Sequence, residues 1–495
     1  MSDADVRGVV FPFAGERRST SAAGRAIVAD ALRPVDPIGA QAAAAESGWR
    51  TAYPEHFRRL VVAGLSSPEA AVTIAQTGAA AVHEHLAWAS VDGSEGTLAE
   101  AVAAISAGTA RKPAAPTREL LTETQRGTGA PERTLKVPYR GARLEGSALR
   151  QQLDDWVTRG IVEPSVATAV GEVIDNPDWL DLSDRKVVVL GAGAEMGPLR
   201  SVLRWGGEVV ALDVPRPDLW RRLLNDTRGY AGWLHLPVRP GPEHAAERAG
   251  ANLVTEWPLV GDWIMSHDGP LVIGNYVYAD GANNVRVCAA VDALTQVVSA
   301  ARPDTALGFL ATPTDVFAVP GTAVSRSVAA YQHATISRAV RYPLRALSGG
   351  RLLTRNYVPG SDPGLNDSIV PQQGPNYLLA KRLQRWRATA ARAAGTQVSL
   401  RVAPPTRTRS VVKNRALAAA YAGAHRFGIE VFDPATANTL MAAVLVHDLR
   451  TGTKTLGHPW LDEAHQAAHG GLWTAAYSAR SALGLAAVLG LGSRS

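Results

Sequence analysis

Residues 186–213 constrain the fold of this chain more than any other stretch. They open with an apolar run, VVVL at 187–190, which carries no charge and is typical of a strand buried on both faces. Residues at helical spacing follow, and a second apolar run comes at 208–212. Between the first run and the helical pattern lie three glycines: Gly191, Gly193 and Gly197. This order predicts a strand, a glycine turn, a helix and a second strand, in a parallel sheet.

The residue types in this unit are those that can hold a nucleotide. Glycines let the backbone approach a phosphate, and the second strand ends on Asp213, whose carboxylate can accept hydrogen bonds from a ribose. Asp213 lies 22 positions after Gly191 (213 − 191), against about 20 in dinucleotide-binding folds. Taken alone, the unit also fits a methyltransferase that uses S-adenosylmethionine, since that class shares the glycine turn and the acid.

Composition and charge narrow the class of protein. The chain has 495 residues, 46% of them hydrophobic, so it exceeds one typical domain and has ample apolar side chains for a core. Its net charge of +6 is spread without a basic stripe that carries aromatic residues, so we expect no nucleic-acid partner. Cys288 is the only cysteine, which predicts a buried thiol in a protein of the reducing cytoplasm.

We expect no export signal and no transmembrane segment. The N-terminus carries acids where a secretory signal needs positive charge. The longest apolar tract near the other end, residues 481–492, is too short to span a bilayer. It belongs to a small-residue helix at 471–489 that suits an interior or subunit contact, so we expect a homo-oligomer. Peripheral contact with a membrane is the other use of such a helix.

The first hundred residues have a helical pattern. Residues 37–107 are rich in alanine, and Ser-Pro-Glu at 67–69 supplies an N-cap, a proline at the first helical position and an early acid. His-Glu-His at 83–85 places two histidines on different faces of a helix. We therefore expect solvated side chains there and no metal site.

Shifts in composition divide the chain into parts. Residues 108–134 combine prolines and glycines with threonines and charges, which is typical of a linker. The predicted parts are a mainly helical N-terminal region (1–107), a linker or surface loop (108–134), a helical lead-in (135–180), a sheet domain (181–435) with an insertion at 319–375, and a helical C-terminal region (436–495).

Strand and helix patterns alternate through the sheet domain. Strands are predicted at 233–238, 271–278, 306–311 and 397–403, and helices at 220–224, 284–300 and 377–394. Such alternation favours right-handed crossovers. The expected fold class is α/β, with a doubly wound, Rossmann-like parallel sheet, a mainly helical N-terminal extension and a helical C-terminal region.

A tyrosine and a lysine four positions apart, Tyr377 and Lys381, open the helix before the last predicted strand. Positions i and i+4 share one face of a helix, so the phenol and the ammonium point into one site. An ammonium lowers the pKa of a neighbouring phenol, which can then exchange a proton with a carbonyl or alcohol oxygen. The pair therefore predicts acid–base chemistry during hydride transfer.

With these residues the chain resembles the short-chain dehydrogenase/reductase superfamily, in an atypical, extended form, over residues 186–432. The resemblance implies an NAD(P)-binding Rossmann fold, and its acid, Asp213, favours NAD over NADP. The residues at matching positions are Gly191, Gly193, Glu195, Met196 and Gly197 in the glycine turn, Asn275 at the fourth strand, Asn284 in the next helix, Thr312 and Thr314 after the fifth strand, Tyr377 and Lys381, and Pro404 and Thr408 in the loop over the nicotinamide.

The chain departs from the family pattern in the glycine turn, where Glu195 replaces the middle glycine. A carboxylate near a pyrophosphate costs affinity unless it turns away or pairs with a base. Arg200 and Arg204 are two bases nearby in the sequence that could serve as such a partner.

The resemblance implies an oxidoreductase that acts on a carbonyl or alcohol of a small molecule with NAD. Tyr377 would be the acid–base residue, with Lys381 lowering its pKa and holding the ribose. Thr312 or Thr314 would orient the substrate oxygen, and Asn284 would support a proton relay. An epimerase or dehydratase could use the same residues. The alternatives are the methyltransferase, against which Leu190 stands where an acid is common, and a Rossmann-like interaction protein without catalysis.

Overall fold

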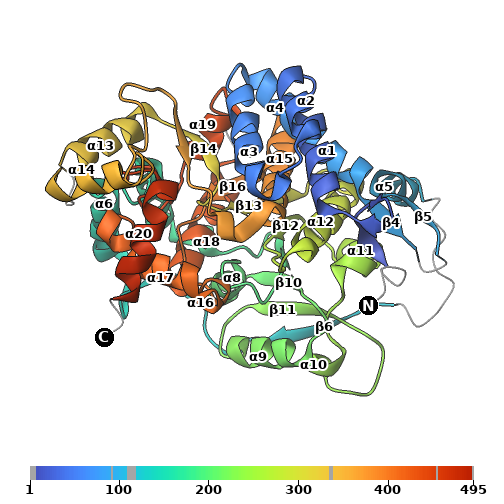
Figure 1. Cartoon of the computed structure of the whole chain (residues 1–495). Helices are drawn as coiled ribbons and strands as arrows, with labels where there is room; N and C mark the ends of the chain where they lie inside the picture. The colour runs from blue at the N-terminus through green and yellow to red at the C-terminus, as the bar shows by residue number, and fades with distance from the viewer. Residues whose placement is uncertain (1–6, 91–92, 109–118, 334–337, 453–454, 493–495) are drawn as a thin grey trace.

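A computed structural model describes residues 7–90, 93–108, 119–333, 338–452 and 455–492 (Figure 1). Its centre is a seven-stranded sheet. In spatial order the strands are β16 (Val398–Val402), β13 (Ala306–Ala311), β12 (Leu271–Asn275), β9 (Lys186–Leu190), β10 (Glu208–Leu212), β11 (Trp233–Val238) and β6 (Leu121–Arg126). All neighbours are parallel except β6, which runs antiparallel to β11. The predicted α/β class and mainly parallel sheet are thus confirmed.

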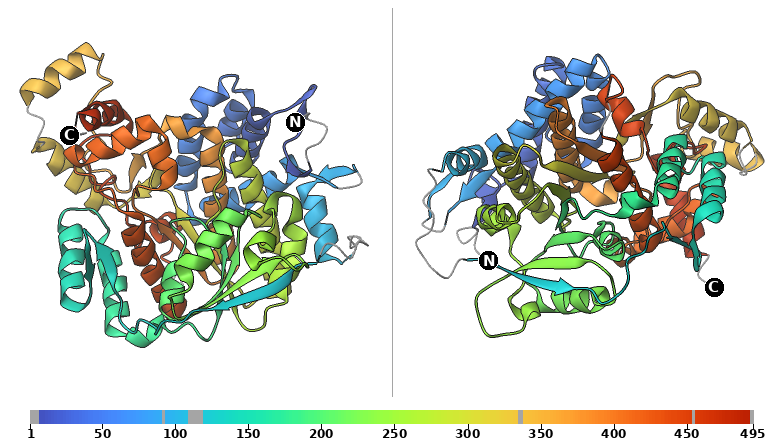
Figure 2. Two further views of the ribbon diagram at one scale, coloured as in Figure 1. Left: turned by 90° about the horizontal axis from the view of Figure 1, so that it is seen from below. Right: turned by 180° about the vertical axis from the view of Figure 1, so that it is seen from behind.

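The sheet is buried on both faces, as its uncharged strands predict. In β9, Val188 and Leu190 pack into one hydrophobic cluster, and Val187 and Val189 pack into the other. The helices on the first face are α11 (Leu253–Met265), α12 (Ala282–Ala301) and α15 (Gly374–Ala393), and those on the second are α8 (Leu199–Arg204), α9 (Pro217–Thr227) and α18 (Pro434–Thr451). Figure 2 shows the helices around the sheet from two further directions.

The predicted strands and helices of the sheet domain are present, with two strands shortened: β12 at its end and β16 by one residue at each end. β12 ends at Asn275 instead of residue 278. Its last bond to β9 joins the N–H of Tyr276 to the carbonyl of Leu190 at 2.9 Å, and the backbone of Tyr276 and Val277 then passes against Gly191 of the glycine turn. Cys288 is buried as expected, and burial raises the pKa of its thiol to about 12.

The N-terminal region is mainly helical, as predicted, and it also contains a small sheet. Its helices are α1 (Thr20–Leu32), α2 (Pro37–Ala45), α3 (Trp49–Gly64), α4 (Pro68–His85) and α5 (Leu98–Ser106). Ser67 caps α4 by accepting the N–H of Ala70 at 3.1 Å. The small antiparallel sheet joins β1 (Gly8–Val10), β4 (Ala87–Ala89) and β5 (Glu95–Thr97), and β2 (Phe13–Ala14) pairs with β3 (Arg17–Arg18).

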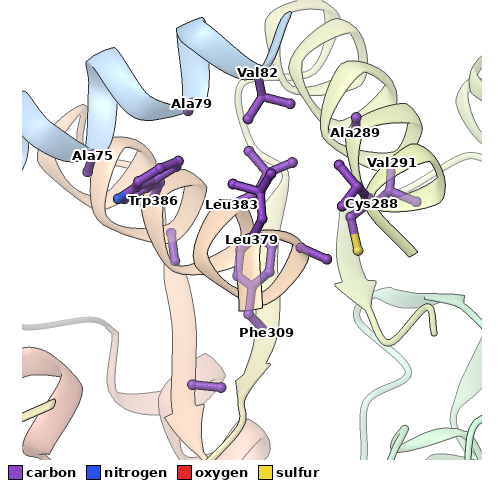
Figure 3. Close-up of a cluster of buried hydrophobic side chains, with 14 of the residues drawn as sticks. Ala75, Ala79, Val82, Cys288, Ala289, Val291, Phe309, Leu379, Leu383 and Trp386 are labelled. Atoms are coloured by element: carbon purple, nitrogen blue, oxygen red, sulfur yellow. The ribbon is translucent and has the colours of Figure 1, made fainter. Parts of the chain in front are cut away.

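Helix α4 packs on α15, so the N-terminal helices form an outer layer over the sheet domain and share its hydrophobic core (Figure 3). Ala75, Ala79 and Val82 face the side chains of Leu383 and Trp386. The two helices approach each other closely at Gly78 of α4, where an added Cβ would lie 2.7 Å from the ring of Trp386.

The expectation that the His-Glu-His sequence is solvated is wrong for His83. This side chain is 4% exposed, and its Nε2 lies 2.7 Å from Asp292 Oδ2. Arg387 donates to the same carboxylate through two nitrogens at 2.7 Å. The packing of α4 against α15 and α12 buries the histidine face, which local sequence spacing does not reveal.

The expectation of a linker at 108–134 is wrong for its central part. Residues 121–126 form β6 at the edge of the main sheet, paired with β11 along its whole length. The polar sequence LTETQR looks like a loop, but an edge strand that is half exposed tolerates such residues. Residues 109–118, with Lys112, Pro113 and Pro116, lie outside the described residues.

The lead-in is helical, as predicted, with helices α6 (Gly146–Thr158) and α7 (Pro164–Asp175), preceded by a hairpin and followed by a short turn. The hairpin is β7 (Val137–Tyr139) with β8 (Ala142–Leu144), and the turn is η3 (Pro177–Leu180). Both helices contribute to the cluster that also contains α18. They therefore extend the second face of the sheet.

The insertion and the C-terminal region add further helices around one end of the sheet. The remaining elements are α10 (Ala245–Arg248), β14 (Val316–Val319), α13 (Gly321–Gln332), α14 (Arg338–Leu347), β15 (Gly364–Asp367), η4 (Pro371–Gln373), α16 (Arg409–Lys413), α17 (Arg415–Gly423), η5 (Ala424–Phe427), α19 (Pro459–Ala464) and α20 (Ala479–Leu491). β14 and β15 are antiparallel. The helix predicted from residue 471 begins only at Ala479. Within the described ranges, no helix has the length and apolar character that crossing a bilayer requires.

A buried ion pair between α18 and β16 should make stability depend on pH. Arg401 donates to both oxygens of Asp448, at 2.9 and 2.7 Å, and Ser399 donates at 2.6 Å. Burial opposes ionisation of Asp448, but the charge of Arg401 and hydrogen bonds, including one with His447, outweigh it and lower the pKa to about 2. The pKa is below its ordinary value, so the stabilisation is present above pH 4 and is lost as pH falls towards 2.

We expect Asp448→Asn to lower the free energy of unfolding at pH 7 by about 3 kcal/mol, because it leaves Arg401 buried without a counter-charge. The difference between wild type and variant should shrink as the pH falls from about 4 to 2. Urea unfolding at several pH values measures this. Asp218→Asn is the control, since that side chain is 83% exposed. A constant difference across this range would contradict the assignment.

Candidate functional site

The glycine turn lies between β9 and α8 at the carboxyl end of the sheet. Gly191 has φ +91°, and an added Cβ there would lie 2.9 Å from the backbone of Tyr276. At Gly193 an added Cβ would lie 2.9 Å from the side chain of Leu219. At Gly197 the space is ordinary, and α8 begins two residues later. Gly191 is therefore required, by its positive φ and by the backbone of Tyr276, whereas a side chain at Gly193 would displace the end of the Leu219 side chain.

Asp213 is joined to this turn. Its Oδ2 accepts the N–H of Gly193 at 2.8 Å, and its Oδ1 accepts the N–H of Val214 at 2.7 Å. Burial raises the pKa of the carboxyl more than these two hydrogen bonds lower it. The carboxylate at the end of β10 is thus held beside the glycine turn.

Glu195 pairs with a base, as one of the two alternatives from the sequence has it, but this base is Arg409 and neither Arg200 nor Arg204. Glu195 Oε2 accepts the backbone N–H of Arg409 at 2.7 Å, and Oε1 lies 3.3 Å from its Nε. Arg200 instead pairs with Asp226, and Arg204 donates to hydroxyls of Ser201 and Thr439. Arg409 opens α16, which follows β16, so tertiary structure supplies a partner that is 214 residues away.

Three hydroxyl groups meet at the carboxyl end of β13. The Oγ1 atoms of Thr312 and Thr314 are 2.8 Å apart, and Thr314 donates to Gln373 Oε1 at 2.9 Å. Tyr377, in the first turn of α15, hydrogen-bonds within this group. The structure therefore brings together the threonines and the tyrosine that sequence alone places 63 residues apart (377 − 314).

The pKa of Tyr377 is raised, opposite to the direction expected from its spacing to Lys381. Burial of the phenol is the main cause, and it outweighs the lowering by hydrogen bonds with Thr312 and Thr314. Burial also lowers the pKa of Lys381. The phenol is thus held in its protonated form.

Lys381 is linked through a glutamine to the end of β12. Its Nζ donates to Gln384 Oε1 at 3.1 Å, and Gln384 Nε2 donates to Asn275 Oδ1 at 3.1 Å. Asn275 and Gln384 are both buried. These two hydrogen bonds connect the predicted residues Lys381 and Asn275 through Gln384, which sequence reasoning missed.

Asn284 lies at the start of α12, where its Oδ1 accepts the N–H of Ala279 at 3.0 Å. The residue is 2% exposed, and its Nδ2 has no hydrogen-bond partner among the described residues. A buried donor without a partner is costly, so this amide is poised for a further contact.

The loop after β16 contains the other predicted residues. Pro404 is buried, and its carbonyl accepts the hydroxyl of Thr406 at 2.8 Å. Thr408 is half-buried and precedes α16, with its Oγ1 at 3.0 Å from Ser410 Oγ. Of this loop and the start of α16, Arg409 is the residue that contacts the glycine turn, through Glu195.

Tyr276 fills the space beneath the glycine turn, and sequence reasoning missed it. An added Cβ at Gly274 would lie 2.3 Å from its ring, and one at Gly308 would lie 3.3 Å from its hydroxyl. Met196 and Tyr276 border a cavity of about 10 Å³. A glycine inside a strand signals such a close approach, so Gly274 was the available clue.

A buried ionic cluster adjoins the hydroxyls of Thr312, Thr314 and Tyr377, beginning at the next residue, Asp315. Asp315 is fully buried and accepts from Arg382 and Arg385, each at 2.6 Å. Arg385 also pairs with Glu463 at 2.6 Å and lies over the ring of Phe317. Because both arginines belong to α15, the cluster fixes the segment of Thr312 and Thr314 against the helix of Tyr377.

Two aromatic residues approach Tyr377 from other elements. The rings of Tyr278 and Tyr377 meet edge to face at an interplanar angle of 67°, with centroids 6.3 Å apart, and Tyr278 is 50% exposed. Tyr421 of α17 is close enough to interact electrostatically with Tyr377. A substrate at Tyr377 would therefore meet aromatic side chains.

In the described part of the chain, no three His, Cys, Asp or Glu side chains are arranged to hold a metal. Comparison with protein-family models, with curated proteins and with solved structures finds no match for this chain.

Proposed function

We propose that the protein is an NAD-dependent oxidoreductase that acts on a carbonyl or alcohol group of a small molecule. The observation that carries this proposal is the grouping of Tyr377 with Thr312 and Thr314 at the carboxyl end of β13. Asp213 and the glycine turn lie on the same edge of the sheet, because β9, β10 and β13 are parallel.

The strand order supports a dinucleotide site. Numbered along the chain from β9, the six parallel strands follow the order 3-2-1-4-5-6 of doubly wound, Rossmann-like folds. In such sheets ligands bind where the strand order reverses, which is between β9 and β12. The glycine turn follows β9 directly, and Asn275 ends β12.

The residues fit a dinucleotide on two observations. Asp213 ends β10 directly beside the glycine turn, where a Cβ at Gly193 would crowd its Oδ2 at 3.2 Å, so glycine lets the turn and the carboxylate approach closely. The unpartnered Nδ2 of Asn284 is a donor near the end of β12. Asp213 would hold a ribose, and Lys381 would hold the other one. The dinucleotide would supply or accept the hydride.

Tyr377 would move the proton in this reaction. Its raised pKa keeps the phenol protonated at neutral pH, which suits donation to a carbonyl oxygen as that oxygen gains charge. Thr312 would orient the same oxygen, since its hydroxyl is half-buried and hydrogen-bonded to Thr314. Thr314 and Gln373 would fix the direction of that hydroxyl.

Titration with NADH, followed by the fluorescence of the 12 tryptophans, tests the proposal. We expect a saturable change with NADH and a weaker one with NADPH. Asp213→Asn should weaken NADH binding about tenfold, because it removes an ionised acceptor. Asp218→Asn, at an 83% exposed position, should leave binding unchanged.

Two results would overturn the oxidoreductase proposal. One is the absence of a saturable change with every nicotinamide dinucleotide. The other is tight binding of S-adenosylmethionine in calorimetry without nicotinamide binding, which would favour the methyltransferase.

We further propose a cytoplasmic homo-oligomer. A free, buried Cys288 supports a reducing compartment. On α20 the side chains of Val488 and Leu491 are 66% and 61% exposed, which supports a subunit contact there.

A further inference from the structure

Glu195 and Arg409 join two segments on either side of the proposed dinucleotide site. Glu195 belongs to the glycine turn, and Arg409 follows the loop after β16. Each carboxylate oxygen meets a different donor of the arginine, the backbone N–H at 2.7 Å and Nε at 3.3 Å. The Glu195 side chain is 22% exposed and the Arg409 side chain is 57% exposed, so both can move into solvent.

The backbone of the glycine turn is held independently of this pair. Asn438, which is 5% exposed on α18, donates to the carbonyl of Gly197 and, at 3.4 Å, to that of Glu195. Ser201 donates to the side-chain oxygen of Asn438 at 3.0 Å and fixes its orientation. The Glu195 side chain can therefore rotate without the turn unfolding.

We propose that Arg409 binds the diphosphate of the dinucleotide, and that the carboxylate of Glu195 occupies this place until the dinucleotide arrives. This inference rests on the proposed function. One oxygen of Glu195 meets the guanidinium of Arg409 and the other accepts its backbone N–H. A phosphate also carries several acceptor oxygens and a negative charge, so it can replace the carboxylate at both donors.

Binding then exchanges one anion for another. A carboxylate left beside the diphosphate would repel it, so Glu195 rotates out and releases Arg409. The ion pair thereby weakens dinucleotide binding by the free energy needed to break it. Ligands without a diphosphate do not compete for Arg409 and escape this cost.

The test compares the affinities of Glu195→Gln, Arg409→Gln and the double variant for NADH, ADP-ribose and adenosine. Glu195→Gln should bind NADH and ADP-ribose about two- to fivefold more tightly, as expected for a partly exposed ion pair. Arg409→Gln should weaken both about tenfold. Adenosine should bind all variants equally. Glu132→Gln and Arg221→Gln, from ion pairs elsewhere on the surface, are the matched controls.

The double variant decides whether Glu195 acts through Arg409. If it does, Glu195→Gln has no effect on NADH binding once Arg409 is glutamine. Unchanged or weaker NADH binding by Glu195→Gln, in a protein whose wild type binds NADH, overturns this inference and leaves the proposed function standing. Failure of the wild type and every variant to bind NADH overturns both.

Discussion

Tyr377→Phe is expected to lower the rate of NADH-dependent carbonyl reduction at least about a hundredfold, because the proton donor is lost. The NADH dissociation constant should stay the same, since the phenol acts on the substrate oxygen and not on the dinucleotide. The loss of the ultraviolet absorbance of NADH, followed over a panel of aldehydes and ketones, gives the rate. Tryptophan fluorescence gives the dissociation constant.

The control for this variant is Tyr342→Phe, at a 63% exposed position on α14, which should keep full activity. A Tyr377→Phe protein that reduces the same substrate at the wild-type rate would contradict the assignment of the proton donor. Equal loss of NADH binding and of rate would instead indicate a structural role for the tyrosine.

Asp315→Ala is expected to lower the free energy of unfolding by about 3–5 kcal/mol. The carboxylate neutralises Arg382 and Arg385, which are 4% and 3% exposed, and its removal leaves an excess of buried positive charge. Urea unfolding followed by circular dichroism measures the loss. The substitution should also disturb the position of Thr314 in the candidate site, since Asp315 is the next residue in the chain.

The matched control is Asp226→Ala, whose carboxylate pairs with Arg200 and is 44% exposed. We expect that variant to lose less than about 1 kcal/mol, because water solvates the freed arginine. If Asp315→Ala loses no more than this control, the cluster does not stabilise the fold.

Short-range patterns were sufficient to predict most elements of the sheet. The strand at Trp233–Val238 and the strand at Ala306–Ala311 have the predicted bounds, because each is a compact apolar run between polar turns. Edge strand β6 was missed because its polar residues face solvent. His83 was placed on the surface because sequence does not tell which face of α4 meets α15.

The candidate site divides in the same way. The closeness of Asp213 to the glycine turn and of Thr312 to Thr314 follows from strand ends and short spacing. Glu195 and Arg409 are 214 residues apart, and Tyr276 fills space left by glycines of two strands, so neither contact has a local signal. The pKa of Tyr377 also depends on burial, which the spacing to Lys381 does not report.

The amino-acid sequence by itself determined the parallel sheet, the glycine turn and the acid that ends β10, because uncharged apolar runs and glycine spacing act over a few residues. Only the tertiary structure decided which charges meet. Burial makes each charge need a partner, and the chain topology brings the partner of Glu195 from α16 and those of Asp315 from α15.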